Sequence, residues 1–134
     1  MPKIYLSPST QDWNMYVTGS GSEEYNMNLL ADALVPYLLS NGIQYQRNRP
    51  EMTAGSSIRE ANQGEYDLYL ALHSNAAPEG RYGEERGIIA FYYPGSVGGQ
   101  RAAELIAQEL RKIYPLPNKV TTRPTTSLGE VRQP

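Results

Sequence analysis

The single histidine of this chain, His73, follows an apolar run and is itself followed by polar residues. The run from Leu68 to Leu72 is short and bounded, which favours a buried strand over a helix. A residue just past the carboxyl end of a strand lies where open α/β sheets place their ligands. His73 is therefore a candidate for metal binding or catalysis. The alternative is a hydrogen-bonded histidine at the rim of a sheet.

A carboxylate is expected beside this histidine. Glu24 lies in the first turn of a predicted helix, and in a βαβ unit that turn meets the carboxyl edge of the sheet. The helix macrodipole favours an ionised carboxylate, the form that a metal needs. Glutamate and histidine are ordinary zinc ligands, but a catalytic site normally has three protein ligands, so Asp12, Glu23 or another group would complete it. The alternative is that Glu24 is an ordinary first-turn glutamate.

The elements that would position these side chains alternate along the chain. Strands are predicted at residues 3–7, 43–47, 67–72, 87–93 and 119–122, and helices at residues 23–41, 56–62 and 100–113. This alternation predicts one α/β domain over residues 1–134, with a mostly parallel or mixed open sheet and helices on both faces.

The two long helices have apolar residues at the three-and-four spacing of a buried face. In the first helix, Ser22 is the expected N-cap, Gly42 the expected terminator, and Pro36 is expected to produce a kink. The predicted buried residues are Leu29, Leu30, Ala33, Leu34, Tyr37 and Leu38 in the first helix and Ala102, Leu105, Ile106, Ala107, Leu110 and Ile113 in the last.

The composition excludes several classes of site. Twelve Lys and Arg against fourteen Asp and Glu give a net charge of −2 with both signs dispersed, which argues against a nucleic-acid partner. The absence of cysteine excludes disulfides, thiolate zinc sites and cysteine nucleophiles, so any metal must be held by oxygen and imidazole. The apolar stretches are much shorter than a membrane span. Eleven tyrosines suit half-exposed positions and sugar-like or peptide-like ligands, although strand-edge packing explains most of them better.

Several short motifs occur in an order that resembles one known family. They are Glu24-Tyr-Asn-Met-Asn28-Leu29, Asn41-Gly42, Ile58-Arg-Glu-Ala61-Asn62, Leu70-Ala-Leu-His73-Ser-Asn75-Ala and Gly87-Ile-Ile-Ala-Phe-Tyr92-Tyr93. Together they resemble the zinc-dependent N-acetylmuramoyl-L-alanine amidases across nearly the whole chain. Each motif alone is weak, and the specificity of the likeness comes from their order and spacing.

The resemblance implies a peptidoglycan hydrolase located outside the cell or in the cell wall. Such an enzyme cleaves the amide between N-acetylmuramic acid and the L-alanine of the stem peptide by metal-assisted hydrolysis, in which zinc polarises the scissile carbonyl. By position, Glu24 and His73 match two of the family's three zinc ligands. Asn75 matches an asparagine expected to shape the substrate groove.

Two departures from the family pattern limit this expectation. The family's first zinc-binding histidine corresponds here to Thr10, and a neutral hydroxyl is a far poorer zinc ligand than imidazole. The family's catalytic glutamate is expected beyond Pro134, in a final strand and helix that the sequence does not contain, so the catalytic base is unknown. We therefore expect an amidase domain truncated at its C-terminal end, and its unpaired sheet edge would favour self-association.

Two other interpretations stay open. The loss of the first histidine favours an inactive amidase-like module that binds cell-wall glycopeptide or a protein partner. The retention of Glu24, His73 and Asn75 argues against it. A scaffold fragment without independent activity is the third possibility.

Overall fold

The computed structural model describes residues 2–11, 21–49, 51–74 and 87–126. By its internal contacts the chain divides into two compact units. Of the described residues, those up to residue 74 belong to unit 1 and those from residue 87 onwards to unit 2. The expectation of one domain over residues 1–134 stays a prediction.

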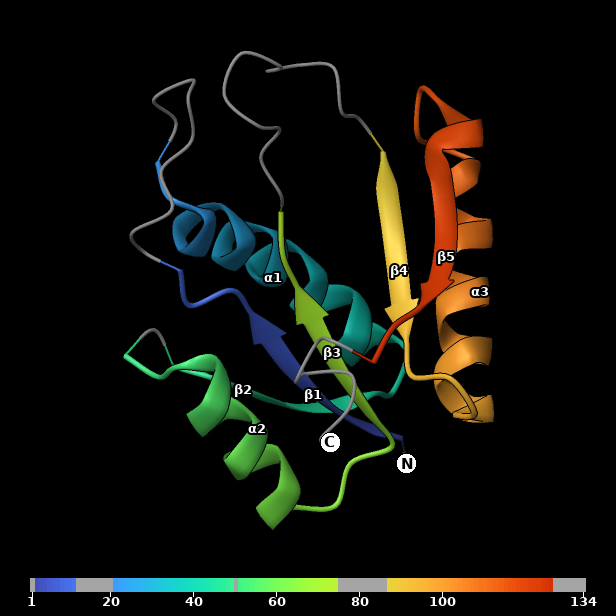
Figure 1. The fold of residues 1–134 in the computed structure, drawn as a ribbon. Helices are drawn as coiled ribbons and strands as arrows, with labels where there is room; N and C mark the ends of the chain where they lie inside the picture. The colour runs from blue at the N-terminus through green and yellow to red at the C-terminus, as the bar shows by residue number, and fades with distance from the viewer. Residues whose placement is uncertain (1, 12–20, 50, 75–86, 127–134) are drawn as a thin grey trace. The chain divides into compact units, whose positions relative to one another are not determined.

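Unit 1 is built on a three-stranded parallel sheet (Figure 1). Its elements in chain order are β1 (Lys3–Pro8), α1 (Glu23–Ser40), β2 (Gln44–Arg47), α2 (Ala54–Gln63) and β3 (Leu68–Leu72). The strand order is β2-β1-β3, so the chain moves from β1 to one side, and then returns across β1 to the other side. Because such crossovers are right-handed, this reversal places α1 and α2 on opposite faces of the sheet.

The side chains of β1 confirm that the two helices lie on opposite faces. Ile4 and Leu6 form a buried core with Ala31 and Leu38 of α1. Between them, Tyr5 points to the other face, where its hydroxyl donates to Glu60 of α2 at 2.9 Å. Alternate residues of a strand point to opposite faces, so β1 separates an apolar layer from a polar one.

The polar layer between the sheet and α2 is fully hydrogen-bonded around Asn48. The Asn48 amide donates to the Ser7 hydroxyl at 3.2 Å, the Pro8 carbonyl at 3.1 Å and the Ser57 hydroxyl at 3.1 Å. The Tyr69 hydroxyl also donates to Ser7, at 2.9 Å. Buried polar groups are costly unless they are paired, and these contacts tie the ends of β1 and β2 to α2.

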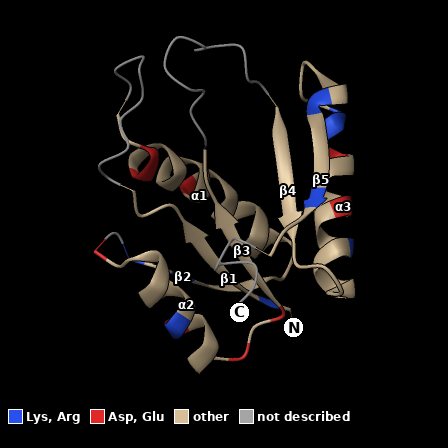
Figure 2. Cartoon of the chain, viewed as in Figure 1, with Lys and Arg blue, Asp and Glu red and all other residues tan. Residues whose placement is uncertain are grey.

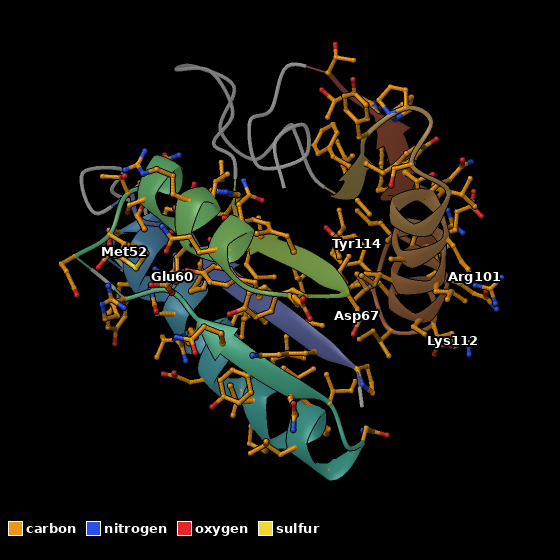
Figure 3. The ribbon with its side chains drawn as sticks, turned by 90° about the horizontal axis from the view of Figure 1, so that it is seen from below. Met52, Glu60, Asp67, Arg101, Lys112 and Tyr114 are labelled. Atoms are coloured by element: carbon orange, nitrogen blue, oxygen red, sulfur yellow. The ribbon has the colours of Figure 1, made fainter. Side chains whose placement is uncertain are left out.

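Tyr5 is the centre of an aromatic group on the same face. Its ring stacks on Tyr69 with centroids 5.3 Å apart and meets the edge of Tyr66 at 5.4 Å. Its partner Glu60 projects from α2 towards the strands (Figure 3) and also receives a hydrogen bond from Arg49 at 3.3 Å. Burial, followed by the hydrogen bond to Glu60, raises the pKa of Tyr5 well above the ordinary tyrosine value.

This raised pKa predicts a loss of stability at alkaline pH. Folded protein holds the Tyr5 proton more tightly than unfolded protein, so its contribution is complete below about pH 10 and is lost as the pH rises further. The free energy of unfolding should fall by at most about 1.4 kcal/mol per pH unit for this group. Measured by urea denaturation, the free energy of unfolding of Tyr5→Phe should fall less steeply with rising pH than that of wild type. Tyr37→Phe, at a residue 70% exposed, should not. Equal slopes in both variants would contradict the prediction.

Unit 2 is a parallel strand pair covered by one helix. It contains β4 (Ile88–Tyr92), α3 (Val97–Arg111), the short 3-10 helix η1 (Pro117–Lys119) and β5 (Val120–Pro124). Ile88 pairs with Val120, and Val120, Ala103 and Ala107 are buried. Lys, Arg, Asp and Glu are interspersed along the described elements (Figure 2).

The ends of α1 agree with the sequence prediction. Ser22 is the N-cap, and its hydroxyl accepts from the Tyr25 amide at 3.0 Å. Gly42 follows the C-cap with φ of +72°, a conformation that favours glycine. The helix is continuous from Glu23 to Ser40 through Pro36. These contacts confirm that local residue types determine where α1 begins and ends.

The predicted buried faces of the two long helices were partly wrong. In α1 the sheet-facing residues are Ala31, Leu34, Val35 and Leu38, whereas Leu29, Leu30, Ala33 and Tyr37 are exposed. In α3 the buried residues are Ala103 and Ala107, whereas Leu105 and Ile106 are exposed and Ile113 lies beyond the helix. In α1 the reason is that apolar side chains occur over much of the helix circumference, so spacing alone does not single out one face.

Candidate functional site at the carboxyl edge of unit 1

The carboxyl ends of the three parallel strands of unit 1 form one edge of its sheet. His73 follows β3 directly, and the Ser9 amide after β1 donates to the Leu72 carbonyl at 2.9 Å. The segment after β1 then meets α1, where the Glu24 amide donates to the Gln11 carbonyl at 3.3 Å. These backbone contacts bring the first turn of α1 to the edge that holds His73, as predicted.

The carboxylate that contacts His73 belongs to Glu23. The Glu23 Oε2 atom lies 3.0 Å from the His73 Nδ1 atom. Glu23 is only 2% exposed, whereas the His73 side chain is 32% exposed. A buried carboxylate is stabilised by a hydrogen bond and by the positive end of the helix dipole, and both are present at this position. The pair therefore combines a buried carboxylate, which can accept a hydrogen bond, with an imidazole that solvent can reach.

Glu24, the residue that the family resemblance favours, lines a different surface. It contributes to a groove of about 330 Å³ together with Tyr25, Asn28, Leu29, Asp32 and Arg47. Within this groove, the Arg47 guanidinium donates to Asp32 at 2.6 Å and to the Asn28 side chain at 2.8 Å. Arg47 ends β2, which lies on the opposite side of β1 from β3. The structure thus places Glu24 in a groove with Arg47 and brings Glu23 to His73.

The described residues supply part of a metal site. Imidazole nitrogen and carboxylate oxygen fit the ligand chemistry of zinc. No group of three or more His, Cys, Asp or Glu suited to a metal ion occurs within residues 2–11, 21–49, 51–74 and 87–126. Thr10 lies in this part of the chain and is half-buried between Ser9 and Gln11. Asp12 and Asn75 lie outside the described residues, so their predicted roles stay predictions.

The contact between Glu23 and His73 was only one of several options in the sequence. The apolar run predicted the position of His73, and the βαβ connection predicted a first-turn carboxylate on the same edge. Glu23 and Glu24 have the same side chain, so the sequence alone does not show which of them faces His73. Only the direction of each side chain in the folded protein distinguishes them. The packing of Arg47 against Asp32 and Asn28 had no sequence signal, because these residues are far apart in the chain.

A parallel sheet with helices on both faces and with polar side chains at its carboxyl edge defines an open α/β fold. Among solved structures, this chain is similar to the N-acetylmuramoyl-L-alanine amidase AmiC2 of Nostoc punctiforme. The TM-score is 0.77 at 13% sequence identity, and the match covers 98% of this chain and 72% of that chain. At this identity the likeness shows a shared fold.

Comparisons at the level of sequence add no further relatives. No protein-family model matches the chain. No curated protein matches it significantly. Among the described helices, none has the length and hydropathy needed to cross a bilayer. The fold therefore carries the functional argument.

Proposed function

We propose that this protein is a peptidoglycan hydrolase acting outside the cell or in the cell wall. Its reaction is cleavage of the amide between N-acetylmuramic acid and the L-alanine of the stem peptide. The observation that carries the proposal is the amidase-like fold, which extends over 98% of the chain. The position of His73 beside Glu23 at the carboxyl edge supports it, because this is where open α/β sheets bind ligands.

The proposed cofactor is zinc, held by His73 and Glu24. Bound there, zinc would supply Lewis-acid polarisation of the scissile carbonyl. His73 has the ligand atom and the solvent access for this role, because a third of its side chain is exposed. Glu24 lies on the first turn of the same helix as Glu23, where the helix dipole favours a charged carboxylate. A third ligand would come from outside the described residues, with Asp12 the sequence-based candidate.

The second candidate is an amidase-like module that binds cell-wall glycopeptide without cleaving it. Thr10, at the position of the family's first histidine, favours this function, because its hydroxyl is a weak zinc ligand. The exposed Tyr25 and Leu29 beside Arg47 give the neighbouring groove a mixed apolar and polar surface, which suits a sugar–peptide ligand.

Release of stem peptide from purified peptidoglycan separates the two candidates. The full-length chain is incubated with insoluble peptidoglycan and zinc, and new N-terminal alanine and pelleted protein are both measured. A hydrolase releases alanine-terminated peptide, and a chelator stops the release. A binding module sediments with peptidoglycan and releases none. A chain that neither binds nor cleaves peptidoglycan would contradict both functions.

A further inference from the structure

The two first-turn glutamates of α1 point in different directions. Consecutive residues of an α-helix are separated by about 100° around its axis. Glu23 is directed to His73 after β3, and Glu24 lines the groove that contains Arg47 at the end of β2. Glu23 therefore makes the contact with His73, and Glu24 contributes to the groove. Their roles are therefore separable by mutation.

The chemistry of the Glu23 contact determines which nitrogen of His73 carries its proton. An ionised carboxylate only accepts hydrogen bonds, so the nitrogen that it contacts must donate. Glu23 contacts Nδ1, at 3.0 Å. In the neutral ring, a proton on Nδ1 leaves the electron pair on Nε2. Histidines that bind metals usually donate their other ring N–H to a carboxylate or carbonyl in this way.

We propose that Glu23 is a positioning residue that holds His73, at the carboxyl edge of the sheet, with Nδ1 protonated. The inference rests on the proposed function only for the identity of the group that Nε2 meets, which would be zinc. The burial of Glu23 supports the role, since a carboxylate 2% exposed has little freedom to turn away from the ring. A carboxylate in water would exchange readily between partners.

The state of the ring can be read directly, because His73 is the only histidine in the chain. The two ring nitrogens of 15N-labelled, metal-free protein are observed by NMR at alkaline pH, where imidazole is neutral. Protonated and unprotonated nitrogens have clearly different 15N shifts. We expect Nδ1 to be the protonated nitrogen in wild type. Glu23→Ala should shift the ring towards the Nε2-protonated form, and Glu23→Gln, whose amide oxygen still accepts, should retain the wild-type form.

Glu65→Gln is the matched control, because it removes an exposed carboxylate at the opposite edge of the sheet and should leave the tautomer unchanged. An Nε2-protonated ring in wild type would overturn the proposal. So would a Glu23→Ala ring identical to wild type. If Glu23→Ala does not fold, the wild-type and Glu23→Gln spectra still test the proposal. A ring protonated on Nε2 in either protein would contradict the assignment of Nδ1 as the hydrogen-bond donor.

Zinc titration of the same proteins distinguishes this inference from the proposed function. A positioning carboxylate typically changes metal affinity by about 10–100-fold, so Glu23→Ala should weaken zinc binding within that range. Glu23→Gln should lose less than Glu23→Ala, because it retains the acceptor. Absence of zinc binding in wild type would contradict the metal in the proposed function and leave the tautomer result standing. A Glu23→Gln loss as large as that of Glu23→Ala, with an unchanged tautomer, would make Glu23 a direct ligand and overturn the positioning role.

Discussion

His73→Ala is expected to lower zinc affinity more than about 100-fold and to abolish release of stem peptide from peptidoglycan. Changes in groups that only support a metal ligand cost about 10–100-fold, so loss of the ligand itself should exceed that range. The substitution also removes the only imidazole in the chain, and with no cysteine present the remaining side-chain ligands are mainly oxygen donors. Isothermal titration calorimetry with zinc measures the first effect, and the alanine-release assay measures the second.

The matched control for this experiment is Glu65→Gln. Glu65 is an exposed carboxylate that lines a groove with Lys3 and Gln44, which start β1 and β2 at the opposite edge of the sheet. If zinc binds at His73, this control should retain wild-type affinity. Equal affinities for wild type and His73→Ala would show that zinc binds to surface carboxylates, and the metal site proposed here would be rejected.

The largest expected effect on stability comes from Leu6→Ala, which should lower the free energy of unfolding by about 2–5 kcal/mol. Leu6 is fully buried in β1, in the same core cluster as Ile4 and the α1 residues Ala31 and Leu38. Removing its side chain loses apolar burial and leaves a cavity that strands paired on both sides cannot easily close. The loss would be a substantial part of the roughly 5–15 kcal/mol typical of a domain.

Leu39→Ala provides the comparison, because it makes the same chemical change at a residue that is 60% exposed. Its effect should be within about 0.5 kcal/mol, as for other surface substitutions. Urea denaturation followed by far-ultraviolet circular dichroism measures both. Similar losses for the two variants would mean that α1 buries a different face from the one assigned here.

Most of the secondary structure could be predicted from the sequence. The predicted strand at residues 67–72 corresponds to β3 (Leu68–Leu72), and the predicted helix at residues 56–62 lies within α2 (Ala54–Gln63). These elements are short and have clear local signals, such as the capping box in which Thr53 and Ser56 bond to each other. Local hydrogen bonding and apolar spacing are properties of neighbouring residues, so they are visible without the fold.

The packing of the helices was less predictable. In α1, Ala31 and Leu38 pack in the core against the sheet, whereas Leu29 and Tyr37 are exposed to solvent. The hydrophobic pattern of α1 allows more than one face to be buried. The choice depends on where β1 and β2 place Ile4, Leu6 and Tyr45 beneath the helix.

For the candidate site, the sequence by itself determined the positions of its parts. His73 follows an apolar strand and Ser22 starts a helix with two glutamates, so an imidazole and a carboxylate were expected at one sheet edge. Only the tertiary structure decided which glutamate faces His73. Residues 23 and 24 have the same chemistry, but they leave α1 about 100° apart, and the position of β3 beside β1 gives Glu23 the contact.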